Sequence, residues 1–243
     1  MMRKYGVGLA VLMSILAPVI ARGGQLGEPA APLAVKEWIK GQPVEVKAGT
    51  NIFVVEIFAT TGLPSRASIT NLNALQRRFR DKGVVVVGVS DEPAERIKDF
   101  LARAGVNVEY AIAADNERQT SLGYMVPVQQ RGVPHAFVVG KDGRLLWHGH
   151  PLQGMDAALE EITAGRYNVD QVVKAETARM QLAQYLALAR KGDPRAGEGG
   201  RRLLSLRTND VLQLCELAFA IATDPKVKNR EDPLASQALD RAE

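Results

Sequence analysis

Residues 51–66 read NIFVVEIFATTGLPSR, and this stretch decides the fold. Its first half, 51–58, is an almost continuous apolar run with many β-branched residues, which is typical of a strand buried on both faces of a sheet. Its second half, 59–66, is rich in turn-forming residues and leads into a helical pattern of apolar side chains. The stretch therefore predicts a central strand, a short connection and a helix packed on the sheet.

Strand and helix patterns continue to alternate downstream of this stretch. Further apolar runs predict strands at 84–89, 110–113, 133–139 and 145–150. The Asp142-Gly143 dipeptide predicts a hairpin turn between the last two of these strands. Alternating strands and helices indicate an α/β fold with a largely parallel sheet, here ending in an antiparallel hairpin.

The chain divides into four expected segments. Residues 1–21 carry two basic residues before an uncharged apolar run, which indicates a cleaved secretory signal and a secreted or periplasmic protein. An uncleaved membrane anchor is the alternative, although the run is short for a membrane span. Residues 22–44 are rich in Gly, Pro and Ala and predict an extended leading segment. Residues 45–165 hold the α/β domain, and 166–243 predict an all-α C-terminal appendage.

The 243 residues include a single cysteine, Cys215. One cysteine excludes an intramolecular disulfide, a CxxC redox pair and any multi-cysteine zinc or iron–sulfur site. Cys215 lies in an apolar helical stretch beside Leu214 and Leu217, which predicts a small core residue. An exposed thiol used for intermolecular pairing is the alternative. The net charge of +4 falls by two with the signal, so it does not indicate a nucleic-acid partner.

Residues 57–66, IFATTGLPSR, resemble the active-site motif FWATWCGPCR of TlpA-like thioredoxins, a redoxin group of thioredoxin-fold proteins. In an ungapped alignment, Gly62 stands at the nucleophilic cysteine and Ser65 at the resolving cysteine. The matching positions are Ala59, Thr60, Pro64 and Arg66. The resemblance implies a thioredoxin-like mixed sheet flanked by helices over about residues 45–165.

The resemblance also implies a binding edge. Residues 132–134, Gly-Val-Pro, resemble the family's cis-proline motif, where backbone groups pair with an extended substrate segment. The binding residues that it implies are Thr61, Gly62, Ser65, Val133, Pro134 and His135.

Glu56 matches the buried carboxylate that helps to move protons in thioredoxins. Two interpretations of Glu56 are open. A buried carboxyl would take up a proton because burial penalises its charge. Alternatively, Glu56 reaches solvent or a basic partner.

The chemistry of the family needs a thiolate that attacks sulfur and a second thiol that resolves the mixed disulfide. The degenerate loop Gly62-Leu63-Pro64-Ser65 offers neither, and a serine hydroxyl is a poor nucleophile without a general base. We therefore expect no catalytic residue in this loop. A hydrolytic pair of Ser65 with His135 is a weaker alternative, because no third orienting group is visible.

No metal or cofactor is expected. His135, His148 and His150 are the histidines of the chain, and no further ligand lies at a telling spacing from them. The chain also has no glycine-rich phosphate loop.

Three functions compete on these grounds. The favoured one is a redox-inactive module that binds a protein or an extended peptide, with no nucleic acid and, after signal cleavage, no membrane as partner. The alternative is an enzyme related to thiol-disulfide oxidoreductases that uses Cys215 or a partner's thiols. The third is a purely structural part of the cell envelope.

Overall fold

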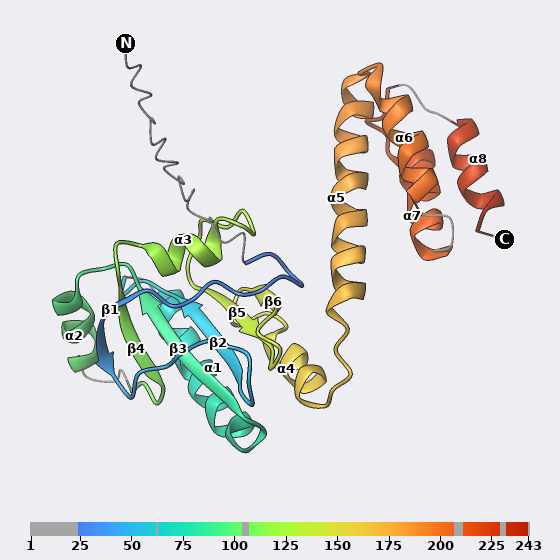
Figure 1. Ribbon diagram of the computed structural model, residues 1–243. Helices are drawn as coiled ribbons and strands as arrows, with labels where there is room; N and C mark the ends of the chain where they lie inside the picture. The colour runs from blue at the N-terminus through green and yellow to red at the C-terminus, as the bar shows by residue number, and fades with distance from the viewer. Residues whose placement is uncertain (1–23, 62, 104–106, 207–210, 229–231, 243) are drawn as a thin grey trace, which may run out of the picture.

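The computed structural model describes residues 24–242 apart from 62, 104–106, 207–210 and 229–231 (Figure 1). The expected signal at residues 1–21 lies outside this part of the chain. Within it, no helix combines the length and the apolar composition that crossing a membrane requires.

The described residues form one six-stranded sheet in the order β1-β4-β3-β2-β5-β6. The strands are β1 (Val35–Lys40), β2 (Ile52–Ile57), β3 (Val84–Ser90), β4 (Ala111–Asp115), β5 (His135–Val139) and β6 (Leu145–Gly149). Strands β2, β3 and β4 are parallel, whereas β1, β5 and β6 each run antiparallel to their neighbours. Every residue of β2 is buried, as its apolar sequence predicts for a central strand.

Helices cover both faces of this sheet. One face carries α1 (Leu63–Phe79), α2 (Ala94–Ala102) and α4 (Met155–Thr163), which pack Leu72, Phe100 and Leu159 against it. The other face carries α3 (Gln119–Met125) and the chain before β1, with Tyr124 and Phe137 at its centre. A mixed sheet sandwiched in this way is the expected thioredoxin-like fold, which is confirmed.

The C-terminal region is helical, as expected, and has a core of its own. It consists of α5 (Val169–Lys191), α6 (Arg195–Leu206), α7 (Val211–Thr223) and α8 (Asp232–Asp240). Their buried side chains include Tyr185, Leu203, Leu214, Leu217 and Leu234. In Figure 1, α5 stands beside the sheet, with α6, α7 and α8 on its far side.

One strand departs from the expected arrangement. The leading segment 22–44 contains β1, which pairs with β4 and extends the sheet by one strand, so the sheet begins before residue 45. Its sequence, VKEWIK, mixes charged and apolar residues because β1 is an edge strand with one side toward solvent. Register irregularities in the pairing of β1 with β4 further interrupt the alternation of inward-facing and outward-facing side chains along β1.

Candidate functional site

The degenerate loop lies at the carboxyl end of β2, where the fold brings the chain into α1. Thr60 is buried, and its backbone N–H donates to Oε2 of Glu92 at 2.6 Å, whereas Thr61 is exposed. Residues 63–65 form the first turn of α1. Gly62 and the side chains of residues 63–66 lie outside what the structure describes.

Glu56 lies near the carboxyl end of β2, on the face of the sheet that α1 covers. Its side chain is 1% exposed, and its carboxyl accepts hydrogen bonds from Oγ of Ser68 and from the hydroxyl of Tyr110, the latter at 3.4 Å. Burial raises the pKa of Glu56 to about 7, and the hydrogen bonds from Ser68 and Tyr110 oppose this rise. In the structure Glu56 is buried, and the partners of its carboxyl are Ser68 and Tyr110 rather than solvent or a basic side chain.

A glycine makes room for the groups around this carboxyl. Gly88 pairs with Glu56 across β2 and β3. A Cβ atom at Gly88 would lie 2.8 Å from Cδ1 of Ile112, 3.2 Å from Cε1 of Phe58 and 3.3 Å from Cε2 of Tyr110. The bare backbone of Gly88 thus lets the Tyr110 ring come close enough for its hydroxyl to reach Glu56.

Sequence reasoning missed Ser68 and Tyr110 as partners of Glu56. The sequence does indicate that Ser68 is buried, because Ser68 lies four residues before Leu72 and so shares its buried helix face. Tyr110 was expected only as the start of a strand, and its distance of 54 residues from Glu56 hides the contact in the sequence.

The expected binding edge lies where β5 begins. The peptide bond between Val133 and Pro134 is cis. Pro134 is buried, whereas Gly132 and Val133 are exposed, with Val133 at 43%. Within the described part of the chain, the backbone groups of Gly132 and Val133 make no hydrogen bond. They are therefore available to an extended segment from another molecule.

His135 points to the opposite face of the sheet from α1. Its ring packs against Phe137, on the side of the sheet that α3 covers, and its Nε2 lies 3.1 Å from Nδ1 of His148. The structure therefore places His135 on the wrong face for the Ser65–His135 pair. Burial, together with the charges of His148 and His150, lowers the pKa of His135 to about 4. The pKa of His148 is also lowered by burial.

Cys215 is exposed on α7, so the expectation that it is a core residue is wrong. The buried side of α7 carries Leu214, Leu217 and Ile221, a spacing that puts residue 215 on the other side of the helix. In Figure 1, α7 lies beyond α5 from the sheet, and Cys215 therefore belongs to the helical region rather than to the loop before α1.

The described residues contain no cluster of three or more His, Cys, Asp or Glu side chains that could hold a metal ion. Among the polar groups at this end of the sheet are the Glu56 carboxyl, the Thr60–Glu92 contact and the exposed backbone at residues 132–133. Such groups can hold a proton and pair with an extended chain, but they supply no nucleophilic sulfur.

Comparisons with known proteins agree with this architecture. A model of the AhpC/TSA family matches residues 26–148. Protein FixW of Rhizobium leguminosarum is 24% identical over 132 residues, which are 51% of this chain and 60% of that protein. The match thus spans less than two thirds of this relative's length.

Two solved structures are similar to part of the chain. A candidate thiol:disulfide interchange protein DsbE from Chlorobium tepidum has a TM-score of 0.47 and 23% identity, over 60% of this chain and 100% of that one. A thiol-disulfide isomerase from Corynebacterium glutamicum has a TM-score of 0.46 and 18% identity, over 58% of this chain and 96% of that one.

Proposed function

Because the chain belongs to the AhpC/TSA family and lacks a cysteine at both Gly62 and Ser65, we propose that it is a redox-inactive binding module. Its occupant is an extended peptide or protein segment held beside Pro134. One observation carries the proposal: the sequence has a single thiol, and this thiol lies on α7, outside the loop that disulfide exchange would use. Without two thiols at that loop, the attack and the resolving step of the exchange have no reactants.

The unpaired backbone at residues 132–133 supports this binding role. The register that pairs Ile57 with His135 puts the loop after β2 and the segment before β5 at one end of the sheet. An extended chain laid along this end would satisfy the N–H and C=O groups of Gly132 and Val133, as strand addition does in other peptide-binding domains. The exposed side chain of Val133 would add apolar contact.

We further propose that the protein is exported, either to the periplasm or out of the cell. The support is the sequence of residues 1–21, with its basic start and its uncharged apolar run. The proposal has a direct check, because mass spectrometry of the protein purified from cells would show a mature chain that begins after residue 21.

The exposure of Cys215 favours a second candidate function. Its thiolate could attack a partner's disulfide, forming one S–S bond to the partner and releasing the other partner sulfur as a thiolate. This chain has no second cysteine to resolve the mixed disulfide. The exchange would therefore stop at the covalent adduct unless the partner supplied the resolving thiol.

Fluorescence anisotropy with labelled, reduced and carboxamidomethylated α-lactalbumin tests the binding module. This probe is an unfolded polypeptide whose thiols are blocked, so only non-covalent binding is measured. We expect saturable binding that Gly132→Pro weakens about fivefold, because proline removes one backbone donor worth about 1 kcal/mol.

Gly132→Ala is the matched control for this experiment. It keeps the N–H group, and a Cβ at Gly132 would meet no atom within 4 Å. We expect it to bind as the wild type does. Absence of saturable binding, or equal binding by the proline and alanine variants, would contradict the proposal.

A further inference from the structure

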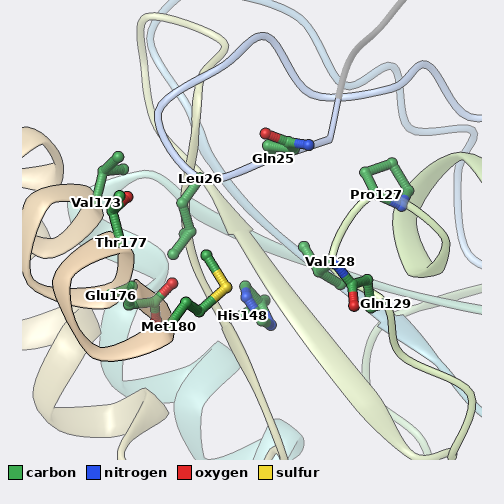
Figure 2. Close-up of a pocket in the computed structure, with 10 residues that line it drawn as sticks. All are labelled: Gln25, Leu26, Pro127, Val128, Gln129, His148, Val173, Glu176, Thr177 and Met180. Atoms are coloured by element: carbon green, nitrogen blue, oxygen red, sulfur yellow. The ribbon is translucent and has the colours of Figure 1, made fainter. Parts of the chain in front are cut away.

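A pocket of about 290 Å³ lies between α5 and the thioredoxin-like domain (Figure 2). Its walls come from four parts of the chain: the segment before β1, the loop after α3, strand β6 and one side of α5. Figure 2 shows Glu176 and Met180 of α5 on the same side of the pocket as Leu26, with His148 between them and Gln129. The volume is near the lower end of the range of about 300–1,000 Å³ that small-molecule sites span.

Two contacts outside the pocket join three of the parts of the chain that form its walls. The backbone N–H of Gly27 donates to the carbonyl of Leu145 at 2.8 Å, which ties the segment before β1 to β6. Nη2 of Arg144, in the turn just before β6, lies 2.8 Å from Oδ1 of Asp170 at the start of α5. These contacts hold the segment before β1 and the start of α5 next to β6.

The charge of the pocket is negative. Glu176 is its acidic residue, and of the lining residues that the structure describes none is Lys or Arg. Nor does Glu176 form an ion pair with any other described residue. Burial lowers the pKa of His148, and the charge of Glu176 opposes this shift, which shows that the carboxylate acts on the ring across the pocket.

The rest of the lining is suited to an aliphatic chain. Leu26, Val173 and Met180 provide apolar surface, and Met180 is 57% exposed at the pocket although it is a large apolar residue. A methionine side chain adapts its shape to the group that packs against it. Gln129 also lines the pocket, and its side-chain amide supplies a hydrogen-bonding group there. Its backbone adopts a φ of 56°, which non-glycine residues rarely do.

We propose that this pocket binds an ammonium or guanidinium group carried on an aliphatic stem, with the cation beside Glu176 and the stem against Leu26 and Met180. A charge-assisted hydrogen bond to a carboxylate in a partly desolvated pocket is among the stronger polar contacts in proteins. Amphipathic cations bury their methylene stem on apolar surface and keep their charged head at a polar group. Such a ligand is either a free organic amine or a Lys or Arg side chain of a partner.

NMR of the full chain labelled at its methionine methyl groups tests this proposal, with hexylammonium chloride as the probe. We expect the Met180 methyl resonance, assigned through Met180→Leu, to shift saturably with hexylammonium. Neutral 1-hexanol has the same stem without the charge, and we expect it to bind at least about tenfold more weakly. Equal shifts with both compounds, or no saturable shift, would overturn the proposal.

Two variants separate the charge of the pocket from its shape. Glu176→Gln keeps the shape and should weaken hexylammonium binding about tenfold while leaving 1-hexanol unchanged. Glu216→Gln, an exposed acid of α7, is the matched control and should bind as the wild type does. If the Glu176 and Glu216 variants bind hexylammonium equally well, the proposal of a cation site beside Glu176 is wrong.

Thr177→Trp covers the case in which Glu176→Gln fails to fold. Thr177 is an exposed residue of α5 that lines the pocket, so a larger side chain fills the pocket without entering a core. It should abolish the Met180 shift with hexylammonium. Undiminished binding by this variant would place the ligand elsewhere and contradict the proposal.

A peptide arm distinguishes the two sources of the cation. If acetyl-Ala-Lys-Ala-Ala-amide binds more tightly than hexylammonium, the pocket takes a partner's basic side chain, and if it binds more weakly, the pocket takes a free amine. Acetyl-Ala-Leu-Ala-Ala-amide should bind in neither case, and binding by it would contradict the charge requirement. Gly132→Pro should leave every one of these shifts unchanged, which separates this site from the proposed peptide-binding edge.

Discussion

The hydroxyl of Ser68 donates a hydrogen bond to the buried carboxyl of Glu56, in a chain whose loop between β2 and α1 has no thiol. Helix α1 supplies Ser68 and the central strand β2 supplies Glu56, so the two main elements of the fold meet at this contact. The buried carboxyl that the resemblance implies is thus present, although the cysteines are not. The effect of this carboxyl on the stability of the fold can be measured without any knowledge of a substrate.

Glu56→Gln should change how stability depends on pH. The folded-state pKa of Glu56, about 7, is above the unfolded value of 4.5, so the folded chain binds the proton more tightly. The contribution of the Glu56 carboxyl to the free energy of unfolding is complete below pH 4.5 and is lost as the pH rises through about 7. At about 1.4 kcal/mol for each pKa unit, the loss by pH 8 is about 3 kcal/mol in the wild type. The glutamine variant cannot ionise and should not show this loss.

Urea unfolding of both proteins at pH 5, 6, 7 and 8 provides the measurement. The difference in free energy of unfolding, variant minus wild type, should rise from pH 5 to about pH 7 and level off above it. Parallel pH profiles for the two proteins would show that Glu56 does not titrate as a buried group.

Ser68→Ala should destabilise the protein and raise the pKa of Glu56 further. The variant removes a hydrogen bond that lowers this pKa, and it leaves the carboxyl with Tyr110 as its partner. Loss of one buried hydrogen bond costs about 1–3 kcal/mol. Carbon-13 NMR titration of the Glu56 carboxyl reports the pKa, and Ser236→Ala on the exposed surface of α8 is the control. An unchanged Glu56 titration in Ser68→Ala would contradict the contact.

Gly88→Ala should cost roughly 1–3 kcal/mol, because the added methyl group would enter an already packed site. Its Cβ would lie 2.8 Å from Ile112 and 3.2 Å from Phe58. Gly49→Ala is the matched control, since a Cβ there meets nothing within 4 Å. Thermal unfolding of the two variants measures the difference, and equal melting temperatures would show that the groups beside Glu56 are not tightly packed.

His135→Phe should protect the fold against acid. The folded-state pKa of His135 is about 4, below the unfolded value of 6.5, so its contribution to stability is present above pH 6.5 and is lost as the pH falls through about 4. The full loss in free energy of unfolding is up to about 3 kcal/mol. Unfolding measured between pH 7 and pH 4 should show a smaller loss in the variant than in the wild type, and identical acid profiles would refute the assignment.

The sequence predicted the sheet better than it predicted which way single side chains face. Long apolar runs such as β2 and β3 identify buried strands because both of their faces must be apolar. Strand β1 escaped detection because an edge strand keeps charged residues on its open side. Its partner, β4, lies more than 70 residues away in the sequence, so nothing local marks the pairing.

Cys215 shows where the same reasoning went wrong. Its apolar neighbours Leu214 and Leu217 suggested a core position, although the spacing of 214, 217 and 221 already placed residue 215 outside the buried side of the helix. His135 could not be oriented from the sequence, because its face depends on the register of β5 against β2. The pocket that contains Glu176 was also invisible, because it forms only where α5 meets the domain.

The most direct test of the lost dithiol chemistry is an insulin-reduction assay on three proteins: the wild type, Cys215→Ala and the double variant Gly62→Cys/Ser65→Cys. The account predicts no turnover above background for the first two, and reductase activity for the double variant. Turnover by the wild type that disappears in Cys215→Ala would contradict it, as would a correctly folded double variant that stays inert.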